Sequence, residues 1–227
     1  MRHTAWIVAE RPTPGQRPLA VLERGLLAQA GRAAVELTPA IPRAMKVLGV
    51  SGSLRHASSN TELLRAVALL APRGLRITLF DGLGGLPHFN PDLDTDPPPP
   101  AVRVLRESIA AADGLLISSP EYAHGVPGVL KNALDWLVSS VAIVGKPIGL
   151  LNGSPRAVHA QASLVEILRT MSADVVPAAH GSVPLLGRNL DAAGIAADPE
   201  LAKVVRGALT ALVEAVQGRA PTASSTG

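Results

Sequence analysis

Residues 45–62 read MKVLGVSGSLRHASSNTE, and this stretch decides the fold class. It begins with the apolar run Val47–Val50, which has the length of a buried strand, and continues with small and hydroxyl residues typical of a tight loop. Ser59 and Glu62 then have the spacing of a capping box, which predicts a helix start near Asn60. A strand, a tight loop and a helix start in this order predict the first unit of a parallel α/β sheet.

The same alternation of strand and helix continues through the rest of the chain. Short apolar runs predict five strands, at Val47–Val50, Leu75–Phe80, Leu115–Ser118, Ile148–Leu151 and Asp174–Val176. Between them apolar residues recur at helical spacing, and Asp198-Pro199 marks the start of a last helix. We therefore expect an α/β fold in which helices wrap a five-stranded parallel sheet.

Composition divides the chain into three parts. Residues 1–44 are rich in Arg, Ala and Pro and are predicted to be an extension outside the fold; residues 45–218 are predicted to form the α/β domain and residues 219–227 a flexible tail. Met45 directly precedes the first strand, so one hypothesis is that the protein starts there, and an intact mass that includes residue 1 would refute it. The proline-rich connection Asp81–Pro100 is long enough to be functional or interfacial, and a solvated detour is an equally good interpretation.

Charge and residue content exclude several classes of function. The formal net charge of +3 lies wholly in residues 1–44, so residues 45–227 are neutral and no nucleic-acid partner is expected. The absence of cysteine excludes disulfides, thiolate nucleophiles and zinc–thiolate sites. The six histidines show no paired spacing, so no metal site is expected. No apolar run reaches the ~18 residues of a membrane-spanning helix, and we expect a cytoplasmic protein without a membrane partner.

The loop after the first strand has the chemistry of an anion site. Backbone N–H groups at the helix start, together with the positive end of the helix dipole, favour a bound anion. Side-chain donors are available from Ser53, Ser58, Asn60 and Thr61, and Arg55 can bind a phosphate through two N–H groups. Neither a Walker A motif nor G-x-G-x-x-G is present, so a terminal phosphate such as that of FMN fits better than a pyrophosphate. The alternative is a capped helix after an ordinary turn, because an S-x-x-E spacing occurs at many helices.

A second loop, Ser118–Gly128, follows the third strand, and its Pro127 suits the first turn of the next helix. In a doubly wound sheet of order 2-1-3-4-5, the loops after strands one and three diverge and leave a ligand-binding crevice between them. Both loops carry motifs of one family: G-S-L-R-x-x-S-x-N at Gly52–Asn60, and P-E-Y followed by P-G-x-L-K-N-A-x-D-W at Pro120–Trp136. With these motifs, residues 45–218 resemble the NADPH-dependent FMN reductase family, which includes quinone, azo-dye and chromate reductases.

The resemblance implies a flavodoxin-like three-layer sandwich with sheet order 2-1-3-4-5. The residues that would hold the FMN phosphate are Ser53, Arg55, Ser58, Asn60 and Thr61. The residues that would surround the isoalloxazine are Pro120, Glu121 and Tyr122, largely through backbone atoms, and Ser154 on the far side. NADPH or NADH would donate hydride, and a quinone, free flavin, azo compound or metal oxyanion would accept the electrons, in a homodimer or homotetramer. Ala123 and Gly125 stand where the family commonly has Asn and Ser, a departure that concerns substrate preference more than flavin binding.

Several of these residues also have a simpler interpretation. Tyr122 is equally well explained by core or interface packing, and packing or a subunit contact explains Trp136 better than ring stacking does. His124 is better explained as an exposed loop residue, and Glu121 by a backbone-only role. Hydride transfer between nicotinamide and flavin needs no acid or base from the protein, so no catalytic side chain is predicted.

Two other classes of function compete with a reductase. A flavodoxin-type carrier binds FMN and shuttles single electrons without using a nicotinamide. Such carriers are strongly acidic and stack aromatic residues on the flavin, whereas the body of this chain is neutral and aromatic residues make up 2% of the sequence. A cofactor-free α/β interaction domain is the third possibility, and a purified protein without flavin absorbance even after addition of FMN would support it.

Overall fold

The computed structural model describes residues 44–219, which are built around one parallel sheet. Its strands are β1 (Met45–Ser51), β2 (Leu75–Phe80), β3 (Gly114–Ser118), β4 (Pro147–Asn152), β5 (Asp174–Val175) and β6 (Gly181–Ser182). Their order is β2-β1-β3-β4-β5, with β6 also paired to β4, and every pairing is parallel. The expected flavodoxin-like order 2-1-3-4-5 is confirmed.

The fifth position of the sheet is divided between two short strands. β5 pairs with the start of β4 and β6 with its end, so the sheet has six strands where five are predicted. Between them Pro177 opens the 3-10 turn η4 (Pro177–Ala179). The chain leaves the sheet in this turn, so the predicted strand Asp174–Val176 ends early and pairing with β4 resumes only at Gly181.

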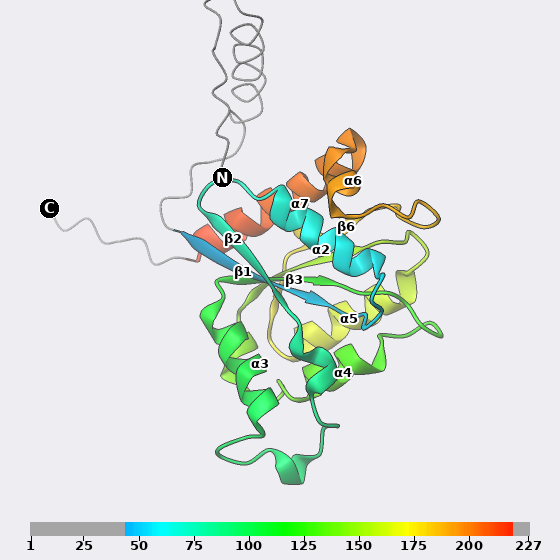
Figure 1. Ribbon diagram of the computed structural model, residues 1–227. Helices are drawn as coiled ribbons and strands as arrows, with labels where there is room; N and C mark the ends of the chain where they lie inside the picture. Colours follow the sequence, from blue (N-terminus) through cyan, green and yellow to red (C-terminus); the bar gives the residue numbers. More distant parts are fainter. Residues whose placement is uncertain (1–43, 220–227) are drawn as a thin grey trace, which may run out of the picture. The chain divides into compact units, whose positions relative to one another are not determined.

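Helices cover both faces of the sheet (Figure 1). In this view α2 (Ser59–Leu69), α6 (Ala192–Ala197) and α7 (Pro199–Gln217) lie above the sheet, and α3 (Pro100–Ala111), α4 (Gly128–Asp135) and α5 (Val158–Thr170) lie below it. Residues of β1 alternate between the two cores: Leu48 faces α3 and α4, whereas Val47 faces α2 and α7. β3 and β4 are buried along their whole length, as expected for central strands of a parallel sheet. The three-layer sandwich is confirmed.

The start of α2 differs from the expectation. Ser58, not Ser59, is the N-cap, and its hydroxyl accepts a hydrogen bond from the backbone N–H of Thr61 at 3.3 Å. The Glu62 carboxylate points to another helix and accepts a hydrogen bond from the N–H of Ala192, the first residue of α6, at 2.9 Å. The predicted Ser59–Glu62 capping box is therefore wrong, because a helix 130 residues away supplies the partner of this carboxylate. The last helix begins as predicted, with Asp198 capping α7.

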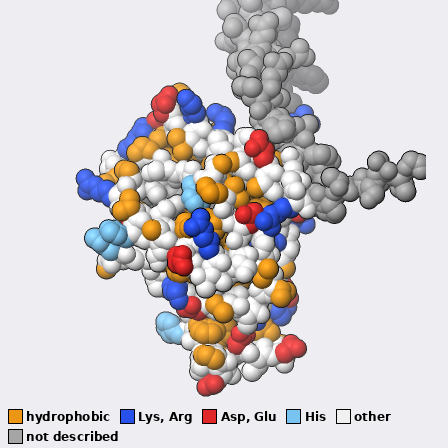
Figure 2. All heavy atoms as spheres, turned by 180° about the vertical axis from the view of Figure 1, so that it is seen from behind, with side chains coloured by type: hydrophobic (Ala, Val, Ile, Leu, Met, Phe, Trp, Pro, Cys, Tyr) orange, Lys and Arg blue, Asp and Glu red, His pale blue; other side chains and the backbone are white. Residues whose placement is uncertain are grey.

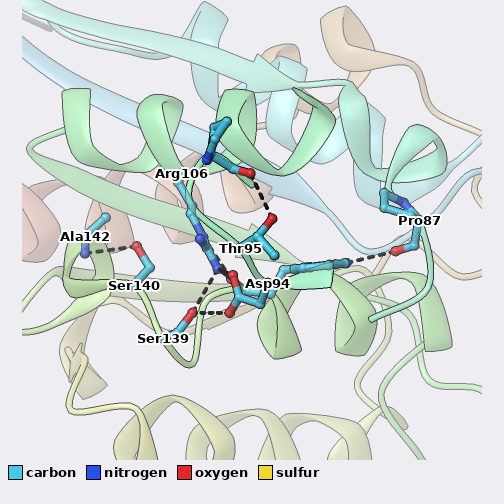
Figure 3. A network of polar contacts seen from close by, with 9 residues as sticks. Pro87, Asp94, Thr95, Arg106, Ser139, Ser140 and Ala142 are labelled. Atoms are coloured by element: carbon cyan, nitrogen blue, oxygen red, sulfur yellow. Dashed lines mark hydrogen bonds and ion pairs between the residues drawn. The ribbon is translucent and has the colours of Figure 1, made fainter. Parts of the chain in front are cut away.

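The long connection between β2 and α3 contains two 3-10 turns, η1 (Gly82–Gly85) and η2 (Pro91–Leu93). Arg106 of α3 holds its far end (Figure 3) by donating to Asp94 Oδ1 at 2.8 Å, to Ser139 Oγ at 2.9 Å and to the Trp136 carbonyl at 2.7 Å. The Ser139 hydroxyl also donates to Asp94 at 2.5 Å. This hydrogen bond, together with Arg106, holds the pKa of the Asp94 carboxyl below its ordinary value.

The described residues cover most of the predicted domain 45–218. Its last helix ends at Gln217 and Gly218 is the C-cap. Apart from Ala44 and Arg219, the residues of the predicted extension 1–44 and of the predicted tail 219–227 lie outside the described residues. Within residues 44–219, no helix is both long and apolar enough to cross a membrane.

Candidate functional site

Hydrogen bonds connect the loop after β1 to β3 and to α2. The N–H of Gly52 donates to the carbonyl of Ser118 at 2.8 Å, and the Ser118 hydroxyl donates to Asn60 Oδ1 at 2.9 Å. The hydroxyls of Ser51 and Thr61 lie 2.8 Å apart. Asn60 is only 7% exposed, so its side chain shapes the loop from within.

The loops after β1 and β3 lie close together at Gly52. A Cβ atom on Gly52 would lie 2.6 Å from the hydroxyl oxygen of Ser119 and 3.1 Å from Leu130. Any side chain larger than hydrogen would therefore push the two loops apart. The glycine sets the distance between the two loops that border the crevice.

A polar cavity of about 630 Å³ opens beside the loop after β1. The loop, the start of α2 and the end of β2 line it, and the first N–H groups of α2 have no partner within the helix. Its polar and charged lining includes Ser51, Ser53, Arg55, Thr61, Arg65, Glu62 and Asp81. Glu62 forms an ion pair with Arg65, which leaves Arg55 and the hydroxyl groups beside the positive end of the helix dipole. This is the chemistry of an anion site.

An apolar cavity of about 790 Å³ adjoins the polar one, because Arg55 lines both. Its walls come from the loop after β1, from η1 and the residues after it, and from the start of α4. The apolar side chains in the lining are Leu54, Leu83, Leu86, Pro127 and Val129, and the others are Arg55, His88, Tyr122 and Asn132. Tyr122 is 52% exposed, so core packing is the wrong explanation of this residue. Pro127 is the N-cap of α4 and does not lie in its first turn.

The loop after β3 contains a tight turn. The backbone groups of Tyr122 and Gly125 exchange hydrogen bonds of 3.2 and 2.9 Å, and the two residues between them, Ala123 and His124, have φ angles of 48° and 58°. Alanine is strained in this left-handed region, which asparagine tolerates, so the departure at Ala123 from the commoner family residue carries a conformational cost. His124 is exposed, as expected, and its ring stacks on that of His159 in α5 with centroids 4.3 Å apart.

The same loop supplies the cap of another helix. Ala157 precedes α5 and has no side-chain oxygen, and the Glu121 carboxylate accepts a hydrogen bond from the Ala160 N–H at 2.8 Å in its place. The Glu121 side chain therefore has a structural role that the sequence does not show. Ser154 lies in the turn after β4, where its hydroxyl accepts from the N–H of Arg156 at 3.3 Å.

The structure brings together some of the predicted site residues and not others. Four of them line the two adjoining cavities: Ser53, Arg55, Thr61 and Tyr122. Five line neither cavity: Ser58, Asn60, Pro120, Glu121 and Ser154. Among residues 44–219, no group of three or more His, Asp or Glu side chains is arranged to hold a metal ion.

Two residues of α4 fasten the long connection against the apolar cavity. Asn132 donates to the carbonyl of Pro87 at 2.9 Å and accepts from the N–H of Phe89 at 2.7 Å, and the Trp136 indole also donates to Pro87 at 2.8 Å. Trp136 is fully buried and meets the Phe89 ring edge to face, so its explanation by packing is confirmed. Leu83 and Leu86 are buried and line the cavity, so the interpretation of the connection as a solvated detour is wrong.

A doubly wound parallel sheet of order 2-1-3-4-5 with helices on both faces defines a flavodoxin-like protein. Within that class, the chain belongs to the NADPH-dependent FMN reductase family, whose model matches residues 45–185.

Individual relatives agree with this assignment. The chain is 45% identical over 112 residues to the NAD(P)H-dependent FMN reductase of Pseudomonas aeruginosa (48% of this chain, 60% of the relative). It is 50% identical over 93 residues to the 2-hydroxy-1,4-benzoquinone reductase of a Burkholderia species (41% of this chain, 50% of the relative). The chain thus spans about half the length of the curated relatives that it matches. Among solved structures, the flavoenzyme NAD(P)H:(acceptor) oxidoreductase of Paracoccus denitrificans is 31% identical, with a TM-score of 0.63 over 77% of this chain and 98% of that one.

Proposed function

We propose that this chain binds FMN across the two adjoining cavities and transfers hydride from NADPH or NADH, through the flavin, to a small-molecule acceptor such as a quinone. The observation that carries the proposal is the position of Arg55, at the boundary between a polar cavity at the start of α2 and an apolar cavity. FMN has the matching composition, with a phosphate monoester at one end and a flat ring system at the other.

The donor set fits a phosphate. Arg55 offers two N–H groups, Ser53 and Thr61 offer hydroxyls, and the start of α2 offers backbone N–H groups that have no partner within the helix. Ser58 and Asn60 support the same site from within the loop, the first by capping α2 and the second by holding the end of β3.

The flavin ring belongs in the apolar cavity beside Tyr122. Tyr122 would contact the ring, and the Glu121 carboxylate, which caps α5, would hold the loop that carries Tyr122. Pro120 and Ser154 line neither cavity and would support the site from the loops after β3 and β4. Bound FMN supplies a hydride acceptor at its N5 atom, and the protein orients the two reactants and excludes water between them. The apolar walls formed by Leu54, Leu83 and Leu86 suit both tasks.

A flavodoxin-type electron carrier fits less well. The matched family is one of reductases, and the relatives of Pseudomonas aeruginosa and of Burkholderia bear the names of an FMN reductase and a benzoquinone reductase. Figure 2 shows basic side chains interspersed with acidic ones on the face turned away in Figure 1, unlike the acidic surface of such carriers. We also propose a cytoplasmic location. We further propose that the protein is a homodimer or homotetramer, and light scattering of the native protein tests this oligomeric state.

Titration of the purified protein with FMN, followed by quenching of flavin fluorescence, tests the phosphate site. Loss of charge-assisted hydrogen bonds worth about 1.5–3 kcal/mol predicts that Arg55→Ala weakens FMN binding roughly tenfold or more. Arg73→Ala is the matched control, because Arg73 is exposed in the turn before β2, at the amino ends of the strands, whereas Arg55 follows the carboxyl end of β1. Equal affinities in the two variants would refute the site.

Stopped-flow absorbance of the FMN-loaded protein tests the reaction. We expect NADPH or NADH to bleach the flavin and a quinone to restore its absorbance. A flavin that stays oxidised with both nicotinamides would refute the activity, whatever the result of the FMN titration.

A further inference from the structure

The long connection places a histidine in the wall of the apolar cavity. His88 is exposed and lines the cavity together with Arg55 and Tyr122, and no carboxylate lines it. Histidine is the side chain that exchanges a proton most readily near neutral pH. The cavity therefore combines apolar walls with an imidazole able to give a proton to a bound molecule.

Asn132 determines where His88 lies. Its amide pairs with the backbone on both sides of this residue, by donating to the carbonyl of Pro87 at 2.9 Å and accepting from the N–H of Phe89 at 2.7 Å. The amide thus takes the place of a neighbouring strand, and the Trp136 indole adds a second donor to Pro87 at 2.8 Å. The backbone of the histidine is clamped while its ring remains accessible.

Charged side chains on the two elements that carry and clamp His88 have partners of their own, and Arg55 is the charged side chain that shares the cavity with it. On α4, Lys131 pairs with Asp135 at 2.6 Å. Farther along the connection, Asp94 is held by Arg106 and Ser139. Within residues 44–219 the imidazole of His88 makes no hydrogen bond or ion pair, so both of its nitrogens are available to a ligand.

We propose that His88 is a catalytic residue on the acceptor side of the reductase and that Asn132 positions it, an inference that rests on the proposed function. Reduction of a quinone to a hydroquinone takes one hydride, which carries both electrons, and one proton. Arrival of the hydride leaves negative charge on a quinone oxygen. The N–H bond of protonated His88 breaks, an O–H bond forms on that oxygen, and the neutral imidazole regains a proton from water because the ring is exposed.

Two electron acceptors separate this role from a structural one. Benzoquinone requires a proton, whereas ferricyanide takes single electrons and requires none. In the FMN-loaded protein, we expect His88→Gln to slow reoxidation by benzoquinone tenfold or more. Reoxidation by ferricyanide and bleaching by NADPH should stay within twofold of the wild-type rates. His159→Gln, which changes an exposed histidine that lines neither cavity, should leave all three rates unchanged.

A binding measurement and a double-mutant cycle complete the test. Calorimetry at pH 7.5 with 4-nitrophenolate, a flat aromatic oxyanion, should show binding about tenfold weaker in His88→Gln. Asn132→Ala should slow the benzoquinone step in the wild-type background but not in His88→Gln, since coupled residues are non-additive. Asn132→Asp keeps the acceptor for the Phe89 N–H, so its benzoquinone step should be faster than that of Asn132→Ala.

Three outcomes would overturn the assignment. They are equal benzoquinone rates in wild type and His88→Gln, equal slowing with benzoquinone and ferricyanide, and equal affinity for 4-nitrophenolate. A flavin that neither nicotinamide bleaches would instead refute the proposed function and would leave the calorimetric comparison to decide the role of His88 in binding.

Discussion

Replacing Arg106 with methionine tests how firmly the long connection is held. Methionine keeps the unbranched stem and removes the guanidinium, which donates to Asp94, Ser139 and the carbonyl of Trp136. The side chains of Arg106 and Asp94 are 19% and 15% exposed, so water can replace only some of the hydrogen bonds that the guanidinium makes. With about 1.5–3 kcal/mol for a hydrogen bond to a charged group, discounted for this exposure, we expect a loss of about 3 kcal/mol in the free energy of unfolding.

Urea unfolding at pH 7 measures this loss, with Arg103→Met as the control. Arg103 lies on the same helix in an exposed pair with Glu107, so its replacement should change the free energy by less than about 0.5 kcal/mol. With a urea dependence of about 2 kcal/mol per molar, the Arg106→Met midpoint should fall by about 1.5 M. A difference of less than about 1 kcal/mol between the two variants would refute the reasoning.

The pH dependence of the same difference gives a second check. The pKa of Asp94 is lowered by the hydrogen bond from Ser139 and by Arg106, so the folded state favours the carboxylate more than the unfolded state does. The stability from this group is therefore fully present above about pH 4 and is lost as pH falls through the lowered pKa. The difference in the free energy of unfolding between wild type and Arg106→Met should therefore be smaller at about pH 3 than at pH 7.

Three further predictions concern the cap of α2, the strained turn and the half-buried His180. Ser58→Ala should lower the free energy of unfolding in urea by about 1 kcal/mol and Ser59→Ala by much less; equal losses would contradict the assignment of the cap. Ala123→Asn should raise that free energy by about 0.5–1 kcal/mol, because asparagine tolerates left-handed φ, and a lower thermal midpoint would contradict this reason. Burial, and then Arg169, lower the pKa of His180, so the unfolded state binds the proton more tightly and stability falls as pH drops through about 6.5. His180→Leu should flatten the change in stability between pH 7.5 and 5.5, and an unchanged slope would refute this origin.

The spacing of apolar residues predicts the helices and strands that are long enough to show a repeated pattern. The strands of five or more residues and α7 were all within reach of the sequence pattern, because each buries a continuous face. β6 and α6 were not, since two residues show no period and the segment AAGIAA of α6 has little apolar contrast. Their places depend on contacts with distant residues, such as the hydrogen bond between Glu62 and Ala192.

The site was predictable at the level of its loops and only partly at the level of its side chains. Sheet topology places the loops after β1 and β3 together, and Arg55 and Tyr122 do line the cavities between and beside them. Local sequence does not show that Asn60 points inward, or that the wall of the apolar cavity comes from the connection before α3. The K-N-A-x-D-W motif signalled Asn132, but its role as a clamp appears only when residues far apart in sequence are brought together.

The first turn of α5 takes its hydrogen-bond acceptor, the Glu121 carboxylate, from the loop after β3. This hydrogen bond at the start of the helix therefore lasts only while the loop stays in place. When this loop lifts away, the Ala160 amide loses the Glu121 carboxylate and meets solvent. The exchange lifetime of that single amide proton thus reports how long the loop stays docked, without any added label. A molecule that rests on the loop should lengthen this lifetime even where it leaves α5 itself untouched.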